Sequence, residues 1–469
     1  MEQTSSPADR RIVLVVASTS AFLAPFMSAS LNIATPAIGR EFGMSAVLLG
    51  WIATAYLLAA AVCLVPFGKI ADQIGRRTIF GWGSLLYAVS SLLAVFAATT
   101  TVFLASRVLQ GIGSAMIFST GMAMLTSAYP PGERGRVLGI NVSFTYLGLS
   151  MGPVLGGALT QNLGWRSIFV LNAVLGFGLA VLVAGKLKRD EGLESSKEKF
   201  DGIGAAIMAV GLVLLMLGLG RLPDPIGGLF VLCSVGVLTV FVLWEKRTAS
   251  PVLEIKLFQG NPVFAFSNLA ALIHYSATSA AGFLLSLYLQ YLKGYSAQTA
   301  GFILLAQPAM MVMFSPLAGR LSDRIEPRIL ASFGMGLSAA GLLVLTGLGP
   351  ETSPVFIVGA LLILGFGFAL FSSPNTNAVM GAVDRRRYGV ASAMLGTMRL
   401  SGQMISMGLA MLLFALVIGR TSIVPDVYPR FLSAARVAFL LFAGLCVGGI
   451  FASLARGKVH PPRNRGEAG

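Results

Sequence analysis

Two copies of one short sequence decide the fold of this chain. Residues 68–77 read GKIADQIGRR, and residues 319–328 read GRLSDRIEPR. The glycine, the aspartate and the last arginine of the two copies are each 251 residues apart, so the copies are in register. The repeat therefore predicts two related halves, in which equivalent polar segments join equivalent helices. The repeated segment contributes these candidate residues: Gly68, Asp72, Gly75, Arg76, Arg77, Gly319, Asp323, Arg324 and Arg328.

The stretches on either side of both copies are apolar and long. Hydrophobic residues make up 55% of the chain and charged residues only 11%, whereas a soluble domain has about 25% charged residues. A membrane-spanning helix needs about 20 mostly apolar residues. We therefore predict an all-α integral membrane protein with fourteen transmembrane helices, centred on residues 12–35, 48–67, 79–98, 101–127, 137–159, 166–186, 202–220, 226–244, 262–288, 299–318, 329–348, 354–376, 388–418 and 434–455.

The net charge of +15 follows this topology. If the N-terminus is cytoplasmic, 25 of the 34 Lys and Arg residues fall in cytoplasmic segments, six in external loops and three near or within spans. Positive charge concentrates on the cytoplasmic side of membrane proteins. We therefore expect a plasma (inner) membrane protein with both termini in the cytoplasm, and the basic charge needs no nucleic-acid partner.

The repeat and the spans together predict an order of segments. We expect two six-helix bundles, residues 12–186 and 262–455, with two extra transmembrane helices (202–244) between them. The remaining segments are a cytoplasmic N-terminus (1–11), two cytoplasmic linkers (187–201 and 245–261) and a cytoplasmic tail (456–469).

The repeated segment has residue types that suit a latch between two states. The first glycine lets two helices approach closely. Asp72 and Asp323 are placed to cap the following helix and to pair with a nearby arginine. The alternative is an ordinary turn that carries topology-setting charges.

Two spans carry further patterns. Arg107 lies inside the fourth span with Gln110 one turn later, and a charge in the bilayer must face a cavity or a partner. In the fifth span Gly148, Gly152 and Gly156 recur every four residues beside Pro153 and Gly157, which predicts a close-packing helix face with a bend. Whether this face only packs or also sets the direction of exchange stays open.

These motifs resemble those of the major facilitator superfamily, and most closely its fourteen-span branch of drug:proton antiporters. The resemblance runs from about residue 12 to residue 455 and rests on segments 68–77, 107–113 and 148–157. Shorter matches are Asn32 to Pro36 and residues 200–202, 251–254 and 288–291. It implies a 6+2+6 arrangement with pseudo-two-fold related halves, alternating access and a monomer. One departure is Met27, where the branch commonly places an acid.

None of the nineteen acidic residues lies in the middle of a predicted span, so the sequence offers no carboxylate there to carry a coupling proton. His274 in the ninth span is the one histidine outside the tail, and imidazole titrates near neutrality. It begins a polar stripe, with Tyr275, Thr278 and Ser279, that we expect to line a water-accessible cavity. The alternative is a neutral, hydrogen-bonded histidine in a packed interior.

Other polar residues within spans are candidates for a substrate path. Arg399 is the second charge inside a span, and it has no arginine counterpart in the first half. The uncharged candidates are Asn32, Tyr56, Tyr146, Gln307, Asn375, Asn377 and Gln403.

Two functions fit these residues. The first is a proton-coupled exporter of amphipathic drugs, which the resemblance favours. The second is an exporter or facilitator of a neutral or anionic metabolite, which the positive interior charges favour. A membrane enzyme or receptor is disfavoured, because the chain has no catalytic constellation, no metal-ligand cluster and no phosphate-binding loop. We expect a small-molecule substrate, a coupling proton and the lipid bilayer as partners, with no cofactor and no metal.

Overall fold

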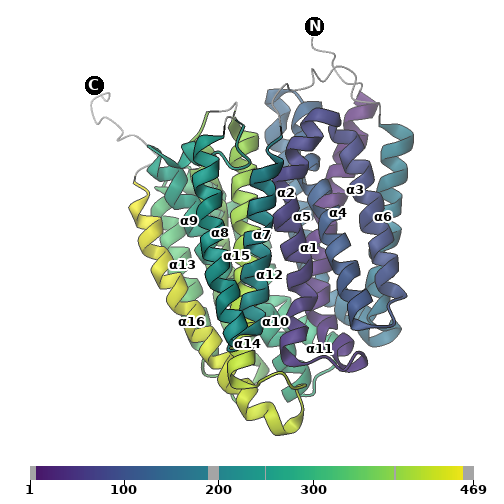
Figure 1. Ribbon diagram of the computed structural model, residues 1–469, viewed down its shortest axis with the longest axis vertical. Helices are drawn as coiled ribbons and strands as arrows, with labels where there is room; N and C mark the ends of the chain where they lie inside the picture. Colours follow the sequence, from purple (N-terminus) through teal and green to yellow (C-terminus); the bar gives the residue numbers. More distant parts are fainter. Residues whose placement is uncertain (1–6, 188–199, 249, 385–386, 458–469) are drawn as a thin grey trace.

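The computed structural model describes residues 7–187, 200–248, 250–384 and 387–457. Across these ranges it contains fourteen helical segments that are long and apolar enough to cross a membrane, which confirms the number predicted from the sequence. Figure 1 shows them side by side in one bundle. The helices are α1 (Pro7–Glu41), α2 (Ala46–Ile74), α3 (Arg76–Val95), α4 (Thr100–Ala128), α5 (Pro131–Leu163), α6 (Arg166–Lys186), α7 (Gly202–Arg221), α8 (Pro225–Arg247), α9 (Pro262–Thr278), α10 (Ala281–Leu287), α11 (Ala297–Leu304), α12 (Ala306–Ser322), α13 (Pro327–Leu345), α14 (Pro354–Gly381), α15 (Tyr388–Val417) and α16 (Tyr428–Ala455), with the short helices η1 (Ile255–Phe258), η2 (Tyr288–Leu292) and η4 (Pro425–Val427).

The helix ends differ from the predicted segment limits in two places. Helix α1 begins at Pro7, so residues 7–11 of the expected N-terminal tail are helical. Helix α8 continues to Arg247, into the expected second linker. In both places polar residues extend a helix beyond its apolar span, because backbone hydrogen bonding does not stop where hydropathy falls. Most of the first linker and of the tail, 188–199 and 458–469, lies outside the described residues.

The helices of the two halves pack in the same pairs. In the first half, α1–α6, the helix pairs in contact include α1 with α5, α2 with α4, α3 with α4, and α3 with α6. In the second half, α9–α16, the equivalent pairs are α9 with α15, α12 with α14, α13 with α14, and α13 with α16. The internal repeat seen in the sequence is therefore a repeat of packing.

Two symmetric crossings join the halves. Helix α2 packs against α15, which is the counterpart of α5 in the second half. Helix α5 packs against α11 and α12, which together are the counterpart of α2. Helices α7 and α8 pack against each other, and α7 also contacts α2 and α15. The pair α7 and α8 therefore lies beside one of the two crossings.

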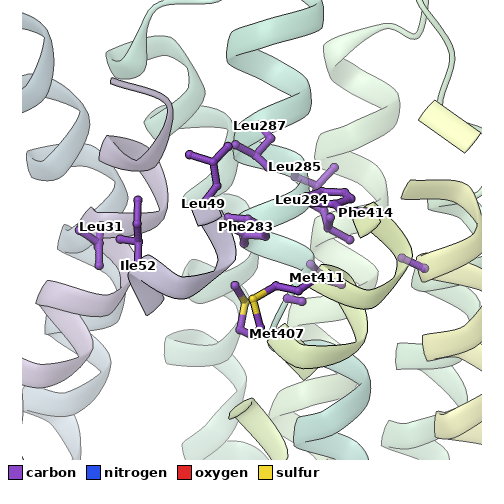
Figure 2. Packing of buried hydrophobic residues seen from close by; sticks show 14 of the residues in the cluster. Leu31, Leu49, Ile52, Phe283, Leu284, Leu285, Leu287, Met407, Met411 and Phe414 are labelled. Carbon is purple, nitrogen blue, oxygen red and sulfur yellow. The ribbon is translucent and has the colours of Figure 1, made fainter. Parts of the chain in front are cut away.

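The hydrophobic core is shared by the halves mainly at one side of the molecule. We call the side where α1 begins and α16 ends the termini side, and the opposite side the far side (Figure 1). The largest core joins Leu31 and Ile52 of the first half to Phe283, Met411 and Phe414 of the second, and it also reaches α7 and α8. Figure 2 shows side chains of this core on helices of both halves. On the termini side each half has a core of its own, one around Phe80 and Leu125 and one around Phe371 and Met394.

The ninth span is not one continuous α-helix. Helix α9 ends at Thr278, α10 begins at Ala281, and the π-helix η2 completes the span. At the break the hydroxyl of Ser406, on α15, accepts a 2.9 Å hydrogen bond from the Ala280 backbone N–H. Broken helices persist inside membranes only where neighbouring groups satisfy the freed backbone. Helix α9 packs on α15 and α16, whereas α10 packs on α1 of the other half.

Candidate functional site

The first copy of the repeated segment is mostly helix. Helix α2 runs through it to Ile74, and only Gly75, with a φ of +108°, breaks the chain before α3. Gly75 is the N-cap residue of α3, and no side chain caps that helix. The expectation that Asp72 caps it is therefore wrong. Asp72 points instead to Arg76, one turn later, and their side chains form a 2.8 Å ion pair.

The two arginines that end this copy bind the ends of neighbouring helices. The Arg77 guanidinium donates to the carbonyls of Val183 and Ala184 at the end of α6, at 3.1 and 2.9 Å. These carbonyls belong to the last turn, which lacks helical partners. Arg76 reaches the Ala123 carbonyl of α4 at 3.4 Å. The segment therefore ties α2 and α3 to α4 and α6.

The second copy has a different detail. Asp323 is the C-cap residue of α12, and Glu326 precedes α13 without a side-chain cap, so the capping expectation fails here too. Among the described residues Asp323 forms no salt bridge. Gly319 and Gly68 are equivalent, and an added Cβ would come 4.0 and 3.7 Å from Ser373 and Ser119. Those are ordinary contact distances, so neither glycine is required by close packing.

The glycine stripe of α5 packs as predicted, and it does so on two helices. Added Cβ atoms on Gly152 and Gly156 would lie 2.5 and 2.6 Å from Ala29 and Ser30 of α1, and Gly148 also faces α1. Gly157 turns to the other half, where its Cβ would lie 2.6 Å from the Ala297 carbonyl of α11. Gly301 of α11 faces the Pro153 carbonyl in return. The stripe and its neighbour therefore bring α5 into backbone contact with both halves.

Arg107 is fully enclosed in the first half. Its side chain is 1% exposed, and its Nε donates to the Ile52 carbonyl at 3.1 Å. The guanidinium also contacts Gln110 Oε1 and lies 4.7 Å from the Tyr56 ring centroid. Gln110 in turn donates to Ser91 at 2.8 Å. Arg107 therefore faces carbonyl, amide and aromatic partners in a chain of contacts between α2, α3 and α4.

His274 does not line a water-accessible surface, so that expectation is wrong in this structure. Its side chain is 0% exposed and is stacked on Phe371 with ring centroids 4.0 Å apart. Nε2 lies 3.2 Å from the Ser338 hydroxyl, and Nδ1 has no hydrogen-bond partner among the described residues. The rest of the stripe turns to its own backbone, since Thr278 and Ser279 donate to the carbonyls one turn before them. A polar stripe in a membrane helix can satisfy itself in this way without meeting water.

Arg399 and Gln403 form a polar patch that is only half-buried. They lie one turn apart on α15. Arg399 donates to the Thr376 hydroxyl at 3.0 Å and lies 5.6 Å from the Tyr275 ring centroid, while its Nε has no partner among the described residues. One turn beyond Gln403, Met407 already belongs to the shared core. Along α15, the patch therefore lies at the end of the shared core that is nearer the termini side.

Asn32 lies on α1, between the shared-core residues Leu31 and Ile33. Its side-chain nitrogen is 3.5 Å from the position of an added Cβ on Gly282, in the first turn of α10 of the other half. Its carbonyl accepts a 2.6 Å hydrogen bond from Ser286, and the Ile33 carbonyl accepts one of 2.9 Å from Gln290. Hydrogen bonds from α10 and η2 to the backbone of α1 therefore join the two halves.

The other candidates divide by exposure. Tyr56, Thr278 and Asn375 are buried, whereas Tyr146, Ser279 and Gln307 are half-buried and Asn377 is exposed. Tyr56 is engaged inside the first half, where its hydroxyl lies 2.6 Å from that of Ser114. Only part of the predicted substrate path is therefore accessible in this structure.

Arg456 is a buried charge that sequence reasoning assigned to the tail. It follows α16 directly, is 0% exposed, and donates to Asn375 Oδ1 at 3.0 Å and to Ser267 at 3.2 Å. Burial lowers the pKa of Arg456 to about 10, so it remains charged at neutral pH. The sequence signal that could have found it is its position directly after the last apolar span.

Comparison with known proteins agrees with this architecture. The sequence profile of the Major Facilitator Superfamily matches residues 17–407 and 267–469. A bacterial homolog of the human lysosomal transporter Spinster, solved in an inward-facing and unoccupied conformation, shares the fold with a TM-score of 0.70, at 18% identity over 96% of this chain and 98% of that one.

Sequence relatives are transporters and exporters. The riboflavin transporter RibZ of Clostridioides difficile is 29% identical over 83% of this chain and 84% of that protein. The cephamycin export protein CmcT of Amycolatopsis lactamdurans is 30% identical over 88% of this chain and 86% of that protein. The multidrug resistance protein Stp of Mycobacterium tuberculosis (strain CDC 1551 / Oshkosh) is 29% identical over 84% of this chain and 74% of that protein. With fourteen membrane helices in two repeated halves, this multi-pass membrane protein belongs to the Major Facilitator Superfamily.

Proposed function

We propose that this transporter is a proton-coupled efflux antiporter for amphipathic small molecules, and that it works by alternating access. The proposal rests on where the hydrophobic cores lie relative to the two sides of the molecule. The halves share a large hydrophobic core on the far side and have separate cores on the termini side. Two halves that share their core mainly at one side are arranged to rock about a site between them.

Half-buried polar residues beside the shared core supply a binding surface. Arg399 and Gln403 offer polar groups one turn from Met407, and Asn32 offers another beside Gly282 of the other half. Flexible methionines beside a few polar groups suit ligands of varied shape. Relatives named for cephamycin export and multidrug resistance support a substrate of this class.

The orientation is also part of the proposal. We infer that the termini side faces the cytoplasm, because it carries the arginines of both repeated segments. A substrate would then enter from the cytoplasm in the state described and leave after the far side opens. We propose a monomer, because both halves of the site come from one chain.

The second candidate is an exporter or facilitator of a neutral or anionic metabolite. Arg399 favours it, because this half-buried cation has one side-chain nitrogen without a partner among the described residues. A relative named as a riboflavin transporter is consistent with a metabolite substrate.

Flux in inverted membrane vesicles separates the two. We expect uptake of a cationic or neutral dye to rise when an inward-acidic proton gradient is imposed and to collapse with a protonophore. Uptake that favours organic acids and ignores the gradient would replace the first proposal by the second.

A further inference from the structure

Two acidic residues stand apart from all others in the described chain, because only Asp201 and Glu245 are buried, with 9% and 1% exposure. Asp201 is the N-cap residue of α7, and Glu245 lies in the last turn of α8. The two helices are packed against each other, so the pair sits where both reach the termini side.

The two carboxylates point into one space beside Gly204. A Cβ on Gly204 would lie 2.6 Å from Glu245 Oε1 and would also overlap Asp201 Oδ2. The space exists because residue 204 has no side chain. Three of the four carboxylate oxygens have donors: Asp201 Oδ1 accepts from the Gly204 N–H at 2.8 Å, Asp201 Oδ2 from the Trp244 indole at 2.9 Å, and Glu245 Oε2 from the Leu253 N–H at 2.8 Å. Glu245 Oε1 has no partner among the described residues.

We propose that the Asp201–Glu245 pair is a proton-binding site. A proton on Glu245 Oε1 supplies the donor that this oxygen and Asp201 Oδ2 can share. Two buried carboxylates facing one space repel each other when both are charged, and one proton removes that repulsion. The helix dipoles assign the proton to Glu245, because the start of α7 stabilises the charge of Asp201 and the end of α8 disfavours a charge on Glu245.

The surroundings of the pair connect it to the repeated segment. Lys69, in the first copy, donates to the carbonyls of Ser250 and Pro251, three and two residues before the Leu253 N–H that Glu245 holds. The charged groups acting on Glu245 are Asp201 and Lys69. The neighbouring η1 segment adds Glu254, half-buried at its start, and Lys256, which is exposed.

The proton therefore controls how firmly the segment that joins α8 to the second half is held. The segment 250–253, which leads into the second half, is held on one side by Lys69 of the first half and on the other by Glu245. Loss of the proton sets Glu245 against Asp201 and loosens α7 from α8, whereas uptake restores their contact. The site is separate from the Arg399–Gln403 patch, and it would serve a facilitator as well as an antiporter.

Infrared spectroscopy of the full-length protein in lipid nanodiscs, titrated with pH, tests the proposal. The wild type should show a protonated-carboxyl band that disappears as pH rises. Glu245→Gln should abolish the band, while Glu254→Gln, a change in the adjoining linker, should leave it unchanged. A band that survives in Glu245→Gln, or no titrating band in the wild type, would overturn the proposal.

A second variant covers the case in which Glu245→Gln does not fold. Asp201→Asn keeps an oxygen to cap α7 and removes the like charge, so the band should weaken at neutral pH. An unchanged band in that variant contradicts the shared proton. Loss of the wild-type band on addition of Na⁺ alone, at constant pH, would assign the pair to a metal cation instead.

Discussion

The hydroxyl of Ser286 donates a 2.6 Å hydrogen bond to the backbone carbonyl of Asn32, across the boundary between the two halves. That carbonyl is free because residue 36, four positions later, is a proline and has no N–H to donate. Gln290 makes the neighbouring bond, to the Ile33 carbonyl. The break after α9 and the proline in α1 thus combine to place backbone acceptors opposite side-chain donors.

Ser286→Ala should favour opening of the far side. One lost hydrogen bond is worth about 1 kcal/mol, which is about fivefold in the ratio of closed to open protein. Distances between spin labels on the far-side ends of α1 and α11 would report it. Ser276→Ala is the matched control, since that hydroxyl bonds within its own helix α9, to the Leu272 carbonyl. Equal distributions in both variants would show that the bond does not hold the far side closed.

Gly301→Val should abolish transport without unfolding the protein. The new side chain would overlap the Pro153 carbonyl of α5, so the halves could not meet on the far side. Gly139→Val, on the same helix α5, is the control, because no atom of the described residues lies within 4 Å of its added Cβ. Flux in vesicles, corrected for the amount of folded transporter, measures the effect, and normal flux from Gly301→Val would contradict it.

His274→Gln should retain flux that depends on a proton gradient. His274 is buried in the second half and stacked on Phe371, so it has no path to water in this structure. Losing the stacked ring should lower stability by about 1 kcal/mol, which a thermal melt would show. If folded His274→Gln protein takes up substrate normally but no longer responds to the proton gradient, His274 would again be the candidate proton carrier.

Arg399→Gln should weaken transport of organic acids more than transport of cations. The change removes a half-buried charge beside Gln403 and leaves a side chain that can still bond to Thr376. Arg430→Gln, an exposed change on the far side, controls for net charge. Competition by a panel of acidic and cationic dyes provides the measurement. If transport of the cationic dyes falls more than transport of the acidic dyes, Arg399 does not face the substrate.

Asp72→Ala should lower flux while the amount of protein in the membrane stays normal. The Asp72–Arg76 pair is partly exposed, so its loss costs stability less than about 1 kcal/mol. The pair instead holds the Arg76 side chain toward the Ala123 carbonyl of α4. Asp426→Ala, an exposed acid on the far side, serves as the control. Wild-type flux from Asp72→Ala would leave the segment with a topological role only.

The sequence predicted the number of spans and the repeat, because both depend on hydropathy and spacing. It did not predict which polar side chains meet water. In a soluble helix an apolar face marks the core, but in a membrane helix lipid-facing and core-facing sides are equally apolar, so His274 and Arg399 could not be told apart. The break between Thr278 and Ala281 was hidden for a similar reason, since a hydroxyl on α15 satisfies it. Arg456 was missed because hydropathy ends at the residue before it.

The separate cores on the termini side have a consequence for synthesis. The core around Phe80 and Leu125 is built only from helices of the first half, so those helices can complete it while the rest of the chain is still on the ribosome. The shared core must wait for Met411 and Phe414, near the end of the chain. Newly made protein should therefore pass through a stage in which its first half is assembled and the face around Leu31 is still covered by lipid or by an insertion factor.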